Sequence, residues 1–141
     1  MQLFLPHADF KKSARDLDVR RLGKQRLEIL ELITFRRPNH PCARAWRGHE
    51  YQAAIFGLAV CDEWIRRGYK DTQRDKIREA MKELLYQPLY PSWFGKKQIH
   101  DIYKGRLISK SPDFYSQIYK DIRSYDDLFP WELIVPGWKR K

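Results

Sequence analysis

The spacing of apolar residues predicts a long helix over about residues 18–34. Val19, Leu22, Leu30 and Ile33 fall on one side of such a helix, because successive side chains turn by about 100°. A turn-like run rich in proline and arginine follows. The helix is therefore expected to bury one side against the rest of the protein.

The rest of the chain also has a mainly helical pattern. Residues 1–12, which contain a proline, are expected to form an extended entry segment. We predict an all-α protein, a compact helical bundle with this extended N-terminal segment and an aromatic C-terminal tail, forming a single domain over residues 1–141. A further helix is expected to begin near Ser13, and another to cover residues 41–68 with a kink at Gly48 and a cap at Gly68. Two more are expected over residues 72–86 and 98–109, and a last one after Ser111 and Pro112.

Two residues on the apolar side of the 18–34 helix need a special environment. Gly23 lacks a side chain and would allow another helix to approach closely. Arg26 carries a charge that is costly to bury without a partner. Because Asp62 lies at the centre of an apolar stripe in the 41–68 helix, we expect an Arg26–Asp62 pair to lock the two helices together.

The composition indicates a folded domain with a polyanionic partner. The chain has 43% hydrophobic residues and 28 Lys and Arg against 18 Asp and Glu, a formal net charge of +10. Nucleic acid and an acidic membrane surface both fit this charge, and the many Trp and Tyr residues favour nucleic acid. Two isolated cysteines predict no disulfide framework or zinc ribbon, and no apolar run suits a signal peptide or membrane helix, so a cytoplasmic protein is expected.

The opposite side of the 18–34 helix forms a polar ridge of Arg21, Lys24, Gln25 and Glu28. One interpretation is a solvated surface with an ordinary Lys24–Glu28 pair, which contributes a few tenths of a kcal/mol, about 0.3–0.5. The other is a catalytic carboxylate among cations that bind phosphates. Periodicity alone favours the solvated surface.

Three stretches carry a resemblance to a known family. LDVRRLGKQRLE, the NHP motif with its following tryptophan, and CDEWIRRGYKDT resemble the pyrimidine-dimer DNA glycosylases, in particular the bacterial branch and more distantly the phage endonuclease V type. The resemblance implies a helical enzyme that straddles duplex DNA and flips out a nucleotide. It implies a DNA N-glycosylase, which we expect to be a monomer that binds double-stranded DNA and needs no cofactor. The spacing of the four histidines and two cysteines matches no zinc site, so we expect no metal.

The resemblance implies that Glu28 is the essential carboxylate that stabilises the developing sugar cation. The phage-type enzyme attacks C1′ with its N-terminal amine, whereas the bulky Gln2 departs from the small residue found there. The Met1 amine, Lys24, or a water activated by Glu28 therefore remain as nucleophiles. We favour the water, and hence a glycosylase with weak or absent strand cleavage.

Basic and polar residues elsewhere are expected to hold the DNA without reading its sequence. His40 stands at a helix start, where it would either bind phosphate or cap the helix. Most tryptophans are expected in the core, with Tyr51, Tyr90 and Trp93 as candidates for base stacking. The expected DNA-binding residues are Gln2, Arg20, Arg21, Gln25, Arg26, His40, Arg44, Arg47, His49, His100 and Arg106.

Two substrates suit such an enzyme, because flipping costs least for a base that is already destabilised. One is a UV-induced pyrimidine dimer, which would make the protein a repair enzyme. The other is a bulky modified pyrimidine, such as the glucosylated hydroxymethylcytosine of phage DNA, which would make it an antiviral enzyme. The competing class is a non-catalytic nucleic-acid-binding module that uses the same basic residues.

Overall fold

The described part of the chain is helical and contains no β-strand, which confirms the all-α prediction. The structure is a computed structural model that describes residues 2–35, 39–125, 128–135 and 137–138. In chain order its helices are α1 (Phe10–Asp16), α2 (Val19–Phe35), α3 (Pro41–Ala45), α4 (Glu50–Arg66), α5 (Arg74–Met81), α6 (Lys97–Lys110), α7 (Pro112–Tyr115) and α8 (Trp131–Ile134).

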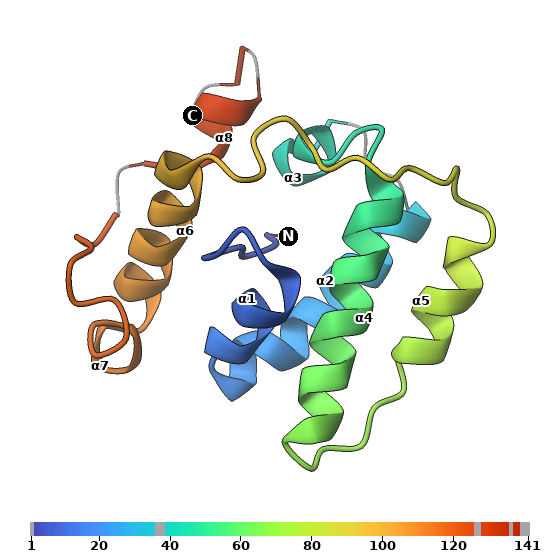
Figure 1. Cartoon of the computed structure of the whole chain (residues 1–141), viewed down its shortest axis with the longest axis horizontal. Helices are drawn as coiled ribbons and strands as arrows, with labels where there is room; N and C mark the ends of the chain where they lie inside the picture. Colours follow the sequence, from blue (N-terminus) through green and yellow to red (C-terminus); the bar gives the residue numbers. More distant parts are fainter. Residues whose placement is uncertain (1, 36–38, 126–127, 136, 139–141) are drawn as a thin grey trace.

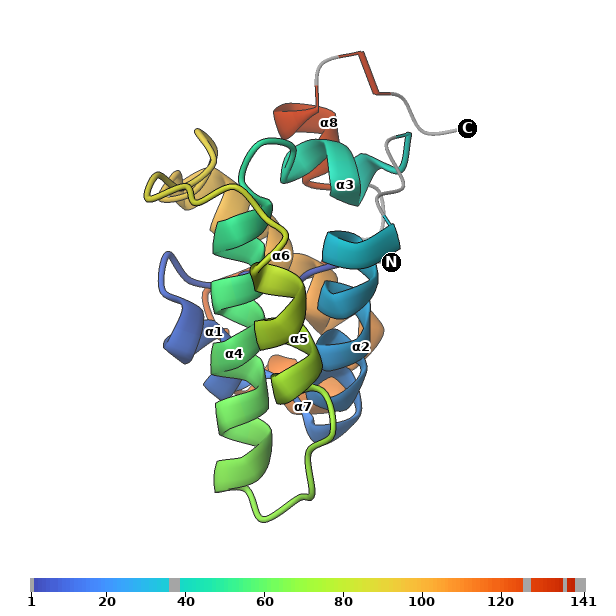
Figure 2. The ribbon, with the colours of Figure 1, turned by 90° about the vertical axis from the view of Figure 1, so that its right-hand side faces the viewer.

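Helix α4 lies at the centre of one half of the molecule. It packs against α1, α2 and α5, while α6 and α7 stand on the far side of the N-terminal segment (Figures 1 and 2). This segment is extended, as expected, and runs between the two halves. Leu3 and Leu5 within it have no solvent exposure, so both halves of the fold share its apolar side chains as a core.

Several predicted helix boundaries are wrong for local reasons. The first helix begins at Phe10 because Asp9 caps it, accepting from the Lys12 N–H at 2.8 Å. Ser13, expected at the start of that helix, is buried within it, and its hydroxyl donates to the His7 carbonyl oxygen at 3.0 Å. Gly48 has a φ of 83° and separates α3 from α4, so the 41–68 region is two helices instead of one with a kink.

The later elements agree better with the sequence pattern. Helix α6 covers the expected 98–109 region, and Pro112 begins α7. Helix α5 ends at Met81, earlier than the expected boundary at residue 86. The aromatic tail contains the short helix α8, with Trp131 buried, where a wholly extended segment is expected.

Helix α4 ends at a glycine, as the sequence predicts. Gly68 has a φ of 94°, its N–H donates to the Ile65 carbonyl oxygen, and the Tyr69 N–H donates to that of Trp64. The Tyr69 ring then stacks on Trp64 with 4.4 Å between ring centroids. Trp64 in turn lies against Gly23 of α2, where an added Cβ would be only 3.0 Å from the indole ring. The expected close helix approach at Gly23 is confirmed.

Arg26 is paired with Asp71, so the predicted Arg26–Asp62 pair is wrong. The Arg26 guanidinium lies 2.6 Å from the Asp71 carboxylate and 4.2 Å from the centre of the Trp64 ring. Asp62 faces outward and pairs with Arg74 at 2.8 Å. The loop after Gly68 brings Asp71 back to α2, a long-range approach that helix periodicity does not show. Burial alone would raise the pKa of Asp71, but the hydrogen bonds from Arg26 and from the backbone N–H groups of Arg74 and Gln73 lower it.

Asp71→Asn should destabilise the protein much more than Asp62→Asn. The Asp71 side chain is 3% exposed, and its neutralisation would leave the Arg26 charge unpaired in the interior, at a cost of about 3–5 kcal/mol. Asp62 is 58% exposed, so its loss should cost below about 1 kcal/mol. Urea unfolding of both variants measures the difference, and equal destabilisation would contradict the assigned pairing.

Candidate active site

The side chain of Gln25 fastens the N-terminal segment to α2. The Phe4 N–H donates to Gln25 Oε1 at 2.6 Å, and Gln25 Nε2 donates to the Gln2 carbonyl oxygen at 2.8 Å. Gln25 is 2% exposed, so both bonds form away from water. Gln25 therefore acts as the backbone of a neighbouring strand would, and it fixes the position of residues 2–4.

Glu28 lies one turn further along the same side of α2. Its Oε2 accepts from the Gln2 N–H at 2.8 Å, and its Oε1 lies 3.7 Å from Lys24 Nζ. The Glu28 side chain is 13% exposed, whereas Lys24 is 74% exposed. The expected Lys24–Glu28 pair is present, but the carboxylate is largely enclosed and does not belong to a solvated ridge.

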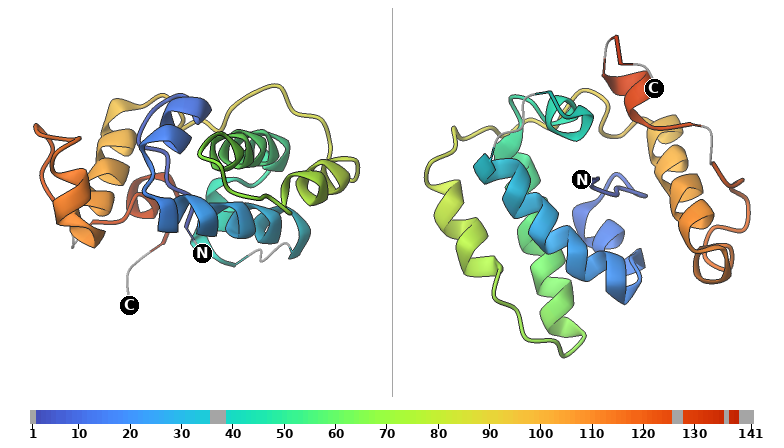
Figure 3. Two further views of the ribbon diagram at one scale, coloured as in Figure 1. Left: turned by 90° about the horizontal axis from the view of Figure 1, so that it is seen from below. Right: turned by 180° about the vertical axis from the view of Figure 1, so that it is seen from behind.

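A pocket of about 350 Å³ opens beside this carboxylate. It lies between α2, the N-terminal segment and the C-terminal end of α6, which flank one another in the view from behind (Figure 3, right). Arg21 is held at the pocket by Asp18 at 3.2 Å and by the Ser111 hydroxyl at 2.9 Å. The lining residues are Gln2, Phe4, Arg20, Arg21, Lys24, Gln25, Glu28 and Lys110.

Lys110 is a residue of this pocket that sequence analysis misses. It is the last residue of α6, more than 80 positions from Glu28 in the chain, and nothing in its local sequence marks it. Burial lowers the pKa of its amine, and the cations Arg106, Arg21 and Lys24 lower it further, while Glu28 opposes them. Burial is the larger cause, and the neighbouring cations act in the same direction.

One polar group in the pocket is left without a partner. The side-chain nitrogen of Gln2 is buried and makes no hydrogen bond within the described residues. Buried donors are nearly always satisfied, but this nitrogen is enclosed by the protein and is not exposed to a ligand in the pocket. The pocket thus presents one carboxylate and four cations.

The pocket brings together Gln2, Arg20, Arg21, Lys24, Gln25 and Glu28 of the residues expected from the sequence. Met1 lies outside the described residues. Arg26 lies on another side of α2 with Asp71, away from the pocket. Arg44 and His40 belong to α3 and its cap, and Arg47 borders a separate hollow near Gly48.

His100 and Arg106 are buried parts of the framework and do not line the pocket. The Gly95 N–H donates to His100 Nε2 at 2.9 Å, which places the proton on Nδ1, and Nδ1 then donates to the Leu5 carbonyl oxygen at 2.7 Å. Arg106 donates to the Tyr125 carbonyl oxygen at 3.0 Å and lies 4.1 Å above the Phe129 ring. Both residues tie α6 to other segments.

The two histidines at helix starts have local partners. His40 caps α3, because its Nδ1 accepts from the Cys42 N–H at 3.1 Å. This is the capping alternative that the sequence left open. His49 Nδ1 lies 2.9 Å from the Leu89 carbonyl oxygen.

The aromatic residues divide as expected between core and surface, with one exception. Trp46 and Trp131 are buried in the core. Trp93, a stacking candidate, is also buried, and its indole N–H donates to the Ala45 carbonyl oxygen at 2.9 Å, so it cannot stack on a base. Tyr90 is half exposed but already stacks on Phe94, with 4.3 Å between ring centroids.

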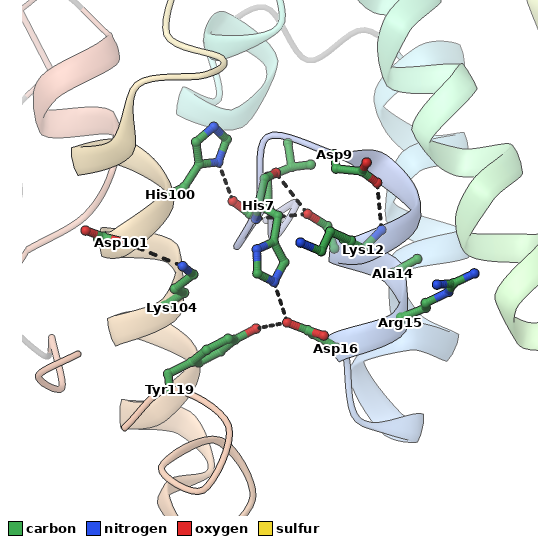
Figure 4. Close-up of polar contacts among 12 residues, drawn as sticks. His7, Asp9, Lys12, Ala14, Arg15, Asp16, His100, Asp101, Lys104 and Tyr119 are labelled. Atoms are coloured by element: carbon green, nitrogen blue, oxygen red, sulfur yellow. Dashed lines mark hydrogen bonds and ion pairs between the residues drawn. The ribbon is translucent and has the colours of Figure 1, made fainter. Parts of the chain in front are cut away.

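A second polar cluster lies on another part of the N-terminal segment (Figure 4). His7 Nε2 is 2.6 Å from Asp16 Oδ2, and the Tyr119 hydroxyl donates to the same oxygen at 2.8 Å. The cluster joins the N-terminal segment, α1 and the chain after α7. It adds a second fastening to the segment that carries Gln2.

Within the described ranges, no group of three or more His, Cys, Asp or Glu side chains is arranged to hold a metal ion. Among the same residues, no helix is both long and apolar enough to cross a membrane.

A comparison with known protein families finds a match. The family model described as pyrimidine dimer DNA glycosylase matches residues 1–77, more than half of the chain. No curated protein and no solved structure matches the chain. The chain belongs to the pyrimidine dimer DNA glycosylase family, and the family name implies a DNA glycosylase with DNA as its partner. The match includes Glu28 and the N-terminal segment, whereas α6 and Lys110 lie beyond it.

The buried His100 should make stability depend on pH near neutrality. Burial lowers its pKa below the ordinary 6.5, so as pH falls below about 6.5 the unfolded chain binds a proton that the folded chain does not. The free energy of unfolding should therefore fall between pH 7 and pH 5.5. The Arg66 hydrogen bond lowers the pKa of Glu63 to about 2. The ionised Glu63 therefore stabilises the folded state in this pH range, and this stabilisation is lost only at more acidic pH.

His100→Gln removes this titration while keeping a donor and an acceptor. Urea unfolding at several pH values should give a flatter profile for the variant than for the unchanged protein. Parallel profiles would show that His100 is not the group responsible.

Proposed function

We propose that the protein is a DNA N-glycosylase that flips a bulky damaged or modified pyrimidine nucleotide out of the duplex and excises its base with Glu28. The observation that carries the proposal is the enclosed Glu28 carboxylate at the wall of a small cationic pocket. A volume of about 350 Å³ is at the small end for ligand sites and suits one extruded nucleotide.

Cleavage of an N-glycosidic bond builds positive charge on the sugar, and a fixed carboxylate beside C1′ stabilises that charge. The Gln2 N–H and Lys24 hold the Glu28 carboxylate in place. In the proposed step, Glu28 accepts a proton from a water molecule whose oxygen bonds to C1′. The C1′–N bond breaks, its electron pair leaves with the base, and a proton from solvent neutralises the base. The product is an abasic site, without strand cleavage.

The cations of the pocket are proposed to bind the phosphates that flank the extruded nucleotide. Arg21 is pre-positioned by Asp18 and Ser111, while Arg20 and Lys24 are exposed at the rim. These contacts recognise the backbone and the shape of the nucleotide but not the identity of the base. The base is selected by how readily its nucleotide flips out of the duplex.

Glu28→Gln should abolish base release while keeping DNA binding. The protein is incubated with UV-irradiated DNA, plain DNA and phage DNA containing glucosylated hydroxymethylcytosine, and abasic sites are counted. We expect abasic sites in one of the two modified DNAs, and a loss of about 10²-fold or more in the variant. Glu31→Gln, on the same helix but outside the pocket, is the matched control.

Each other outcome of this assay has a distinct meaning. Abasic sites in plain DNA would contradict both substrate proposals. Full activity of Glu28→Gln would reject the catalytic assignment. Binding without base release from any of the three DNAs would favour a non-catalytic binding module. Borohydride treatment during the reaction should trap no covalent adduct. An adduct at Met1, Lys24 or Lys110 would show that the nucleophile is an amine and not water.

Lys110→Met should weaken DNA binding and reduce its salt dependence. A lysine that contacts a phosphate contributes about one unit to the slope of log affinity against log salt concentration. Lys104→Met, on the same helix but near Asp101 and the Tyr119 ring, is the matched control. Fluorescence anisotropy with duplex DNA measures both slopes. If Lys110→Met has the same slope as the unchanged protein, Lys110 does not belong to the proposed DNA interface.

A further inference from the structure

A groove with a different chemical character lies on another side of α2. It runs between α2 and α5, two helices that lie side by side in Figure 2, and encloses about 700 Å³. Leu30 and Ala80 are packed on the core at this groove, and Leu27 at its edge is 52% exposed. Leu27, Leu30 and Ala80 line the same hollow among charged residues, and apolar patches rimmed by polar residues mark binding surfaces.

The apolar surface continues beyond the end of α5. A neighbouring hollow of about 380 Å³ shares Glu83 with the groove and is lined by Leu32, Leu84 and Leu85. Leu85 is 91% exposed, so its whole side chain is available for contact. Arg47 and Glu50 also line this second hollow, so apolar and charged side chains alternate past the C-terminal end of α5.

The charges around the groove are opposite in sign to the charge of the whole chain. Glu31, Glu79 and Glu83 line it, and Lys76 is the one cation among the described lining residues. Lys82 lies 2.9 Å from the Glu79 carboxylate, so with this neighbour the groove has three carboxylates against two cations. A protein with a net charge of +10 thus carries a groove with a small local excess of carboxylates, which favours a basic partner over an acidic one at this place.

We propose that this groove binds a basic amphipathic helix of a partner protein. The groove follows α5 from Lys76 to Ala80 and the turn after the helix to Glu83, a span of about two helical turns that matches two turns of a docked helix. Leucine-sized side chains of the partner would fill the hollow beside Leu27 and Leu30, and its lysines or arginines would meet the three glutamates.

The groove and the Glu28 pocket share no lining residue, although α2 contributes to both. A partner in the groove therefore leaves the cationic pocket open to DNA. The inference does not rest on the proposed glycosylase chemistry, and its test requires no DNA.

The test compares two helical peptides of 14 residues with the same leucine pattern, one with lysine and one with glutamate at every polar position. Fluorescence anisotropy measures their binding to the whole protein. The net charge of the chain favours the glutamate peptide, whereas the groove favours the lysine peptide. We expect the lysine peptide to bind at least about tenfold more tightly, a difference of about 1.4 kcal/mol.

The variant Glu79→Lys with Glu83→Lys should abolish this preference, and Leu27→Ser should weaken binding of the lysine peptide. Asp113→Lys with Asp121→Lys changes the net charge equally on exposed residues elsewhere and should leave the preference intact. Circular dichroism melting confirms that each variant is folded. Stronger binding of the glutamate peptide, or an unchanged preference after the Glu79 and Glu83 changes, would overturn the proposal.

A second copy of the chain is the alternative occupant of the groove. Sedimentation velocity distinguishes it, because self-association that Leu27→Ser disrupts would mean that the groove is a dimer interface. That result would also overturn the proposal of a basic partner helix.

Discussion

The position of the N-terminal segment against α2 is the constraint on which the rest of the structure depends. The Gln25 amide holds the backbone at residues 2 and 4 through two buried hydrogen bonds. An extended segment without a neighbouring strand would otherwise leave buried backbone groups unpaired, at about 1–3 kcal/mol each. The same arrangement places the Gln2 N–H on Glu28 and aligns the apolar side chains of Leu3 and Leu5 with both halves of the core.

The functional consequence is that one helix carries three environments. Toward the N-terminal segment, α2 presents Gln25 and Glu28 at the cationic pocket. Toward α4 it presents Gly23 and Arg26, which pack on Trp64. Toward α5 it presents Leu27 and Leu30 at the groove. DNA and a basic partner can be separated on one small domain because opposite local charges lie on different sides of α2.

Sequence reasoning succeeded where a local signal determines the structure. The helical spacing of residues 18–34, the glycine cap at Gly68 and the proline at the start of α7 are all such signals. It failed where distant segments meet. Asp71 reaches Arg26 through a loop, and Lys110 reaches the pocket from the end of α6, so neither is visible in a helical wheel. The wheel also assigned Gln25 to a solvated ridge, because it cannot show that the N-terminal segment covers that side.

The family resemblance supplied what periodicity could not, namely the chemical role proposed for Glu28. Without it, the Lys24–Glu28 spacing has an ordinary explanation as an exposed ion pair. The structure adds a separate physical reason to consider Glu28 further, because its side chain is 13% exposed and borders a pocket with four cations.

The most direct measurement of the central claim compares two DNA duplexes that mimic an abasic nucleotide, one with a cationic pyrrolidine ring and one with a neutral tetrahydrofuran ring. The pyrrolidine imitates the charge that develops on the sugar, so the measurement does not require knowledge of the excised base. The account predicts that the protein binds the cationic analogue at least about tenfold more tightly, and that Glu28→Gln removes the difference. If the unchanged protein and Glu28→Gln prefer the cationic analogue by the same factor, Glu28 is not the carboxylate that stabilises the sugar cation.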